Sequence, residues 1–273
     1  MRKPWDRGVV EFAVGAAAGA LIVRERQRRN VAERLAAAVL ETLLRAIDAN
    51  DNETGGHVRR VARYALILAD AADLDAREQR NVERVALFHD IGKIDEALFD
   101  IIHDNSKLTP EELRAVRTHP QRGAEVLAPL AAFYPELADG VLSHHERWDG
   151  KGYPRKLRGN AIPIAARIVS IADSFDAMTF TRRYQSARSF EDATETLMAG
   201  RGTQFDPNLV DLFLSPPVIQ AATEVLEADH RPRPRRAPRT RQRKETPLPK
   251  LSFRWRTTTP APHARGRRRR KSS

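Results

Sequence analysis

The sequence predicts an all-α protein in which one catalytic-size domain carries appendages, and three observations support this fold class. A chain of 273 residues exceeds what one compact core needs but is short for two full-sized domains with linkers. No stretch between Asn30 and about Ser215 shows the sustained alternation of a β-strand, and the breaks fall at turn sequences such as 149–154 and 159–160. In the same stretch apolar residues recur at helical intervals of three and four, as in Val58, Val61, Tyr64, Ala65 and Leu68.

The first 30 residues are predicted to form a helix with an apolar part and a basic part. The run from Phe12 to Val23 is uncharged and has basic residues on both sides. Its 12 residues are fewer than the roughly 20 that a helix needs to cross a bilayer. Gly15 and Gly19 form a small-xxx-small pair that lets two helices approach closely. We therefore expect residues 1–30 to form a homodimer or to lie on the inner face of a membrane, in an otherwise cytoplasmic protein.

Residues 31–216 are predicted to form the catalytic domain. The segment Thr109-Pro110-Glu111-Glu112 marks a helix start, because threonine caps the N-terminus, proline fits the first turn and a glutamate three residues after the cap completes a capping box. The chain has no cysteine, which excludes disulfides and thiolate metal sites. Any metal ion must therefore be held by nitrogen and oxygen.

Residues 217–273 are predicted to form a disordered basic tail. From His230 onward there are 17 Lys and Arg residues against one acidic residue, whereas the rest of the chain has 30 basic and 35 acidic residues. The net charge of +11 therefore belongs to the tail. Its prolines and its shortage of large apolar side chains leave too little surface to bury to offset the entropy of ordering. The tail either contacts nucleic acid or an anionic membrane through its arginines, or it is simply solvated.

Six of the eight histidines precede the tail, and five of them stand near other potential metal ligands. Glu53 and His57 are four residues apart, which puts both on one face of a helix. His89 and Asp90 lie among apolar residues, where a polar pair is costly unless a metal or strong hydrogen bonds satisfy it. Lys93, one turn beyond Asp90, would direct an ammonium group at an anion bound by that metal.

Three further features complete the pattern. His119 precedes a proline that fixes the local backbone, and His144 and His145 precede a glycine-rich turn that carries Tyr153. Asp173 follows an apolar run, where a buried acid needs a partner. Each group taken singly has an ordinary structural explanation. Together they predict a cluster of metal ions.

The order of these motifs resembles the signature of the HD-GYP family of bacterial cyclic di-GMP phosphodiesterases. That order is an upstream His, then His-Asp-Ile-Gly-Lys, a lone His-Pro, His-His-Glu-x-x-Asp-Gly-x-Gly-Tyr-Pro and a downstream Ile-Ala-Asp. The resemblance runs from about Leu44 to Phe213 and ends in Gly-Thr-Gln-Phe-Asp-Pro at 202–207. It implies an HD-type helical bundle that encloses a multinuclear metal site.

The resemblance also implies roles for individual residues. It makes Asp90 and Lys93 catalytic, and it assigns substrate contacts to Lys93, Tyr153 and Arg182. Arg183, Gln185 and a longer loop after Ile94 depart from the family pattern, and these departures bear on substrate identity more than on the metal site. The implied metal ligands are Glu53, which would help to hold a third ion, and His57, His89, Asp90, His119, His144, His145 and Asp173.

The implied function is hydrolysis of cyclic di-GMP to linear pGpG, with a further cut to GMP where a third ion is bound. The implied cofactors are two or three divalent ions, iron or manganese first, with zinc or magnesium as alternatives that the same ligands suit. Two other functions stay open. One is an HD-type phosphohydrolase for another cyclic dinucleotide or a nucleotide, and the other is a non-catalytic module that binds cyclic di-GMP.

Overall fold

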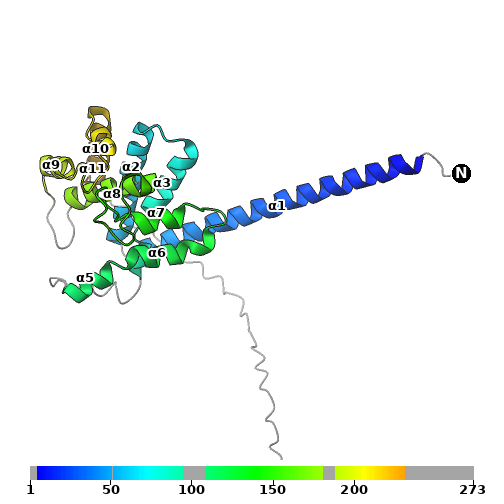
Figure 1. Cartoon of the computed structure of the whole chain (residues 1–273), viewed down its shortest axis with the longest axis horizontal. Coiled ribbons are helices and arrows are strands. Elements are labelled where there is room, and N and C mark those ends of the chain that lie inside the picture. The colour runs from blue at the N-terminus through cyan, green and yellow to red at the C-terminus, as the bar shows by residue number, and fades with distance from the viewer. Residues whose placement is uncertain (1–4, 51, 95–108, 181–187, 231–273) are drawn as a thin grey trace, which may run out of the picture. The chain divides into compact units, whose positions relative to one another are not determined.

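A computed structural model of the chain describes residues 5–50, 52–94, 109–180 and 188–230, and no β-strand occurs among them. The predicted all-α fold class is thereby confirmed (Figure 1). In chain order the elements are α1 (Trp5–Asn50), α2 (Asn52–Ala71), α3 (Ala76–Phe88), η1 (Ile91–Ile94), α5 (Pro110–Val116), α6 (His119–Leu127), η2 (Ala128–Leu130), α7 (Leu137–Ser143), η3 (Gly159–Ala161), α8 (Ile164–Thr179), α9 (Phe190–Ala199), α10 (Pro207–Phe213) and α11 (Pro216–His230).

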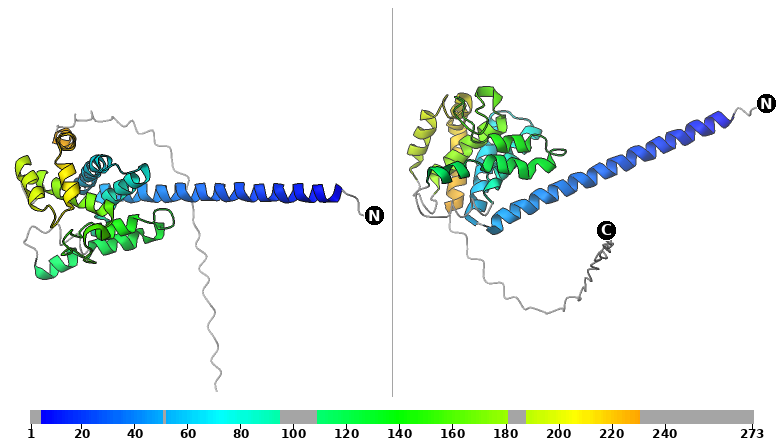
Figure 2. Two further views of the ribbon diagram at one scale, coloured as in Figure 1. Left: turned by 45° about the horizontal axis from the view of Figure 1, so that its top comes forward. Right: turned by 60° about the horizontal axis from the view of Figure 1, so that its bottom comes forward.

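Helices α2 and α8 form the centre of the bundle. Helix α2 contacts α1, α3, α8, α10 and α11, and α8 also contacts α3, α7 and α9 (Figure 2). The sequence of α8 is apolar around most of the helix, so it can be covered on several sides at once. The Phe175 ring of α8 lies 5.2 Å from the rings of Tyr64 and Phe213, centroid to centroid. Burial of each such side chain stabilises the fold by about 1.5–3 kcal/mol.

Local capping fixes where several helices begin. The predicted capping box of α5 is present, because the Thr109 hydroxyl accepts a hydrogen bond from the Glu112 amide and the Glu112 carboxylate accepts one from the Thr109 amide. Asp75 and Glu78 form a second capping box at the start of α3. These boxes satisfy amide groups that would otherwise lack acceptors.

The structure corrects two predicted boundaries. Helix α1 continues through residue 30 without a break and packs on the bundle through Ala36, Leu40 and Ile47. The predicted tail does not begin at 217, because 216–230 form α11, whose Val218 and Ala222 are buried in the core. Pro216 and Pro217 stand in the first turn of α11, where a missing amide hydrogen has no cost.

Several predictions fall outside the described residues. They concern the tail from 231 onward and the side chains of residues 1–22, so the homodimer, the tail contacts and the membrane association stay predictions. In the described part, no single helix has the length and apolar content of a membrane span. Helices α10 and α11 meet that test only as a pair, which is bent by 67°.

Candidate metal centre

Three histidines are oriented in the same way at the C-terminal ends of three helices. His89 is the C-cap of α3, His144 is the C-cap of α7, and His119 follows the end of α5. Each donates its Nδ1 hydrogen to the carbonyl three residues earlier, at 2.8 Å, 2.6 Å and 2.7 Å respectively. Because a carbonyl only accepts, the proton sits on Nδ1 and the lone pair on Nε2. This is the orientation that metal-binding imidazoles take.

The lone pairs of these rings converge on one buried space. The Nε2 atoms of His119 and His144 lie 3.2 Å apart. The carboxylate of Asp90 approaches the same rings, with Oδ1 at 3.3 Å from His119 Nε2 and Oδ2 at 3.5 Å from His89 Nε2. His89 Nε2 and Asp90 Oδ1 are buried without a hydrogen-bond partner in the described part of the chain. Facing lone pairs and orphaned polar atoms are costly, and a cation between them removes the cost.

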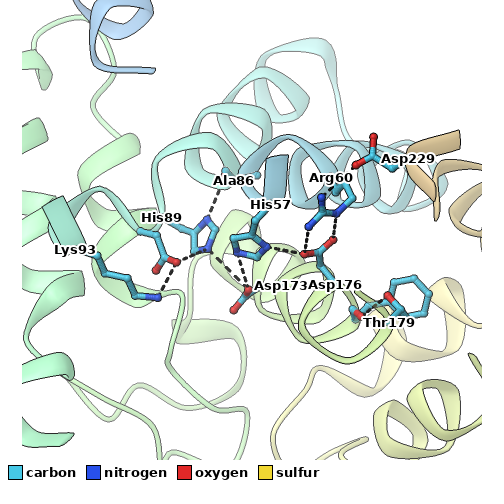
Figure 3. Close-up of polar contacts among 11 residues, drawn as sticks. His57, Arg60, Ala86, His89, Lys93, Asp173, Asp176, Thr179 and Asp229 are labelled. Atoms are coloured by element: carbon cyan, nitrogen blue, oxygen red, sulfur yellow. Dashed lines mark hydrogen bonds and ion pairs between the residues drawn. The ribbon is translucent and has the colours of Figure 1, made fainter. Parts of the chain in front are cut away.

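His57 and Asp173 extend this space toward α2 and α8 (Figure 3). His57 Nε2 lies 3.3 Å from Asp173 Oδ1, and His89 Nε2 lies 3.9 Å from the same oxygen. Two groups of potential ligands have their atoms within 4.8 Å of one another: His57, His89 and Asp90, and His119, His144 and His145. The residues present therefore fit more than one ion.

Burial keeps most of the histidines neutral. Burial lowers the pKa of His119 to about 3 and that of His145 to about 4, and it also lowers the pKa of His144 well below its usual value. Burial raises the pKa of Asp90, but Lys93 and His89 outweigh this effect and hold the pKa well below its usual range. At neutral pH the site thus offers imidazole lone pairs and ionised carboxylates, the forms that bind metals.

His57 is oriented by a carboxylate that is not among the predicted metal ligands. Asp176 is fully buried and its Oδ2 lies 2.6 Å from His57 Nδ1. Burial lowers the pKa of His57, but the contacts with Asp173 and Asp176 outweigh burial and leave the pKa raised. The available signal was spacing, because Asp176 follows Asp173 by three residues and so lies on the same face of α8.

Lys93 lies beside the predicted metal ligands, as its motif implies. Its Nζ donates to Asp90 Oδ2 at 2.7 Å, and its side chain is 30% exposed. The preceding Gly92 allows η1 to approach α6 closely, since a Cβ atom there would lie 2.1 Å from the carbonyl oxygen of His119. The close approach places the ammonium group at the edge of the space that the histidines surround.

Tyr153 stands against the other edge. Its ring stacks on His145, with centroids 4.9 Å apart and planes 22° apart. The loop after it is held by Glu146, a buried side chain whose two oxygens accept the amides of Arg155 and Leu157 at 2.6 Å and 3.0 Å. The sequence analysis had not singled out Glu146.

Arg117 is another residue at this edge that the sequence analysis missed. It is exposed, and its Cζ lies 5.5 Å from the centroid of the Tyr153 ring. In the sequence, its position two residues before His119 could have indicated that it lies near the site. Arg182 and the side chain of Glu53 lie outside the described residues, as do Arg183 and Gln185.

Comparison with known proteins identifies relatives of the chain. The HD domain family model matches residues 41–209. The chain is 39% identical over 174 residues to a Vibrio cholerae protein named 3'3'-cGAMP-specific phosphodiesterase 2, which covers 63% of this chain and 33% of that protein. It is also 39% identical over 177 residues to a cyclic di-GMP phosphodiesterase response regulator of Xanthomonas campestris, covering 64% of this chain and 46% of the relative.

The chain thus spans a third to about half of the length of these relatives. Among solved structures, a cyclic GMP-AMP specific phosphodiesterase of V. cholerae matches with a TM-score of 0.51 at 23% identity, over 70% of this chain and 52% of that chain. This likeness concerns the fold. The family model covers more than half of the present sequence, and the chain therefore belongs to the HD domain family, as its resemblance to the HD-GYP phosphodiesterases implies.

Proposed function

We propose that the chain is a metal-dependent phosphodiesterase that hydrolyses a cyclic dinucleotide, with cyclic di-GMP as the substrate. The observation that carries the proposal is the convergence of the Nε2 atoms of His89 and His119 on the carboxylate of Asp90, with the Nε2 atom of His144 3.2 Å from that of His119. The names of the relatives support the same class of substrate. The product would be linear pGpG, and GMP where a third ion is bound.

The ligand assignment follows the two groups of side chains. His57, His89 and Asp90 would hold one ion, and His119, His144 and His145 a second, with Asp173 next to the first group. Nitrogen and oxygen donors suit iron and manganese, and also zinc or magnesium. When bound, such ions supply Lewis-acid stabilisation of phosphate charge and lower the pKa of water.

The chain's own groups would bind and orient the phosphodiester. The Lys93 ammonium lies beside Asp90, where it can stabilise the negative charge that develops on the phosphate oxygens. Burial raises the pKa of Tyr153 to about 12, so its hydroxyl stays protonated and can donate a hydrogen bond to the substrate. Arg182, which is outside the described residues, completes the proposed substrate contacts.

A second substrate has a specific observation in its favour. The name of one relative specifies 3'3'-cGAMP, and the sequence departs from the family pattern at Arg183 and Gln185. Turnover of cyclic di-GMP, 3'3'-cGAMP and cyclic di-AMP by the same metal-loaded sample would rank the three. We expect cyclic di-GMP to have the highest kcat/KM.

Two substitutions test the reaction itself. Asp90→Ala removes a carboxylate shared by His89, His119 and Lys93, so bound metal and turnover should both be lost. Lys93→Ala should retain the metal while kcat falls on the order of 10²–10³-fold, which is typical for loss of one electrostatic group at a reacting centre. Metal content and hydrolysis would be measured on the same anaerobically purified samples.

Asp70→Ala is the matched control, because Asp70 is an exposed residue of α2. It should leave both quantities unchanged. Parental rates of cyclic dinucleotide cleavage by Asp90→Ala would refute the proposed function.

A further inference from the structure

Helix α11 lies beyond the stretch matched by the HD domain family model, yet one of its side chains is connected to the candidate metal centre through two intervening residues. The match ends at residue 209, and α11 comprises Pro216–His230. Asp229, near the end of α11, points toward Arg60 of α2 (Figure 3). The Arg60 Nη1 donates to Asp229 Oδ2 at 3.1 Å.

Arg60 connects this carboxylate to Asp176. Its Nε and Nη2 form a fork on Asp176, at 2.6 Å and 3.0 Å from the two oxygens. The Oδ2 atom of Asp176 also lies 2.6 Å from His57 Nδ1. A continuous chain of polar contacts therefore runs from Asp229 through Arg60 and Asp176 to His57, a predicted metal ligand.

The surroundings leave Arg60 little freedom. It is only 4% exposed, and its Cζ lies 3.5 Å from the centroid of the Phe180 ring. The fork on Asp176 uses one edge of the guanidinium group, so Nη1 needs a second acceptor on the opposite side. Asp229 supplies that acceptor. Without Asp229, the guanidinium group loses the acceptor of its Nη1 atom and can shift. The Asp176 carboxylate, which is bound to the other edge of the group, can then shift with it.

The chain of contacts leads to only one of the two ligand groups. His57 belongs to the group with His89 and Asp90, and Asp176 is the carboxylate that orients it. His119 and His144, in the other group, are oriented by main-chain carbonyls, that of Val116 at the end of α5 and that of Val141 in α7. A disturbance at Asp229 can therefore change the orientation of His57 without changing that of the other group.

We propose that Asp229 is a positioning residue for the ion held by His57, His89 and Asp90, and that α11 is thus a functional part of the metal centre. The inference rests on the metal site of the proposed function. It adds a residue from outside the matched HD domain, and it assigns that residue to one ion of the cluster.

The test is a titration of the metal-stripped full chain with Mn²⁺. Electron paramagnetic resonance measures the concentration of free Mn²⁺ at each step and so gives the amount bound. The parental protein should show at least two classes of binding site, and His57→Ala identifies the class that depends on His57. Asp229→Ala should weaken that same class about tenfold, the lower end of the range for residues that orient metal ligands, and leave the other class unchanged. Glu227→Ala is the matched control, because Glu227 is an exposed acid on the same helix. It should bind Mn²⁺ as the parental chain does.

Equal weakening of all classes by Asp229→Ala would indicate a general structural role and overturn the inference, as would unchanged binding. If Asp229→Ala does not fold, Asp229→Asn retains the volume and should weaken the same class by a smaller factor. Absence of Mn²⁺ binding by the parental chain would overturn the metal site together with this inference. Selective Mn²⁺ loss in a protein that cleaves no cyclic dinucleotide would leave the inference standing and remove the proposed function.

Discussion

Glu146 holds a loop at the edge of the candidate metal centre without being a predicted ligand itself. Its carboxylate accepts two main-chain amides on either side of Lys156, whose φ of 57° lies in the left-handed region. A carboxylate is suited to this position because it has acceptors on both oxygens and no donor. The loop that it holds carries Tyr153, which stacks on His145.

Glu146→Gln should therefore raise KM for the cyclic dinucleotide several-fold while metal content stays at the parental level. The amide NH₂ of glutamine would face a main-chain N–H, and a buried donor left unsatisfied costs about 1–3 kcal/mol. Steady-state kinetics and urea unfolding would measure the two effects. The control is Glu195→Gln, on the exposed surface of α9. An unchanged KM would show that the loop keeps its position without Glu146.

At the residue scale, the sequence indicates which side chains lie together where they are close in the chain, and gives no such indication where they are far apart. His89, Asp90 and Lys93 occur in one short motif, and the structure places them in contact. Arg60, by contrast, contacts Asp176, which is 116 positions further along the chain, and Asp229, which is 169 positions further along. Residue spacing along one helix cannot predict such pairs, because they arise only when α2, α8 and α11 pack together.

At the scale of elements, the close approach of η1 and α6 brings the motif of Asp90 next to His119. Gly92 makes it possible, since a Cβ atom there would lie 2.1 Å from the His119 carbonyl oxygen and 2.7 Å from the Gly123 amide nitrogen. Both of these are main-chain atoms, so no side-chain rotation can relieve the clash.

Gly92→Ala should therefore separate η1 from α6 and lower both stability and metal content. Overpacking of this kind typically costs 1–3 kcal/mol, and here it also moves two predicted ligands apart. Thermal unfolding and metal analysis are the measurements. Ile94→Ala, at a 41% exposed position of the same short helix, should change stability by no more than about 0.5 kcal/mol. Normal metal content in Gly92→Ala would contradict this account.

The sequence predicts an element well when the residues that determine it are close together in the chain, and poorly when they are far apart. The start of α5 was predicted because its capping box spans four residues. The extent of α11 was missed, because residues 217–230 were included in the basic, proline-containing segment that follows them. Its buried positions, Val218 and Ala222, contribute to a core formed by distant helices, and such packing leaves only a weak pattern in a short helix.

At the scale of the whole molecule, the buried histidines predict how the stability of the metal-free protein depends on pH. Their pKa values are lowered in the folded state, to about 3 for His119 and about 4 for His145, whereas an unfolded histidine titrates near 6.5. Below pH 6.5 the unfolded chain therefore binds more protons, and stability is lost as the pH falls. His57 has a raised pKa and acts in the opposite sense.

Because His119, His144 and His145 outnumber His57, the melting temperature of metal-free protein should be lower at pH 5 than at pH 7.5. Carboxylates with lowered pKa values contribute to acid unfolding only nearer pH 4 and below, so this window reports the histidines. Calorimetry of metal-stripped protein at the two pH values is the measurement. His145→Gln should reduce the difference, and a melting temperature that rises at pH 5 would contradict the assignment.

The charge of the helix ends beside the histidines bears on the order in which metal ions and substrate bind. A helix carries partial negative charge at its C-terminal end, and the ends of α3 and α7 lie at this space together with the carboxylates of Asp90 and Asp173. At His119 the end of α5 meets the start of α6, so their opposite partial charges offset each other. That field attracts cations and repels a phosphodiester. Under the proposed function, bound cations would offset this negative potential. We therefore expect metal-free protein to bind the cyclic dinucleotide more weakly than metal-loaded protein does, and an equal affinity would contradict this order of binding.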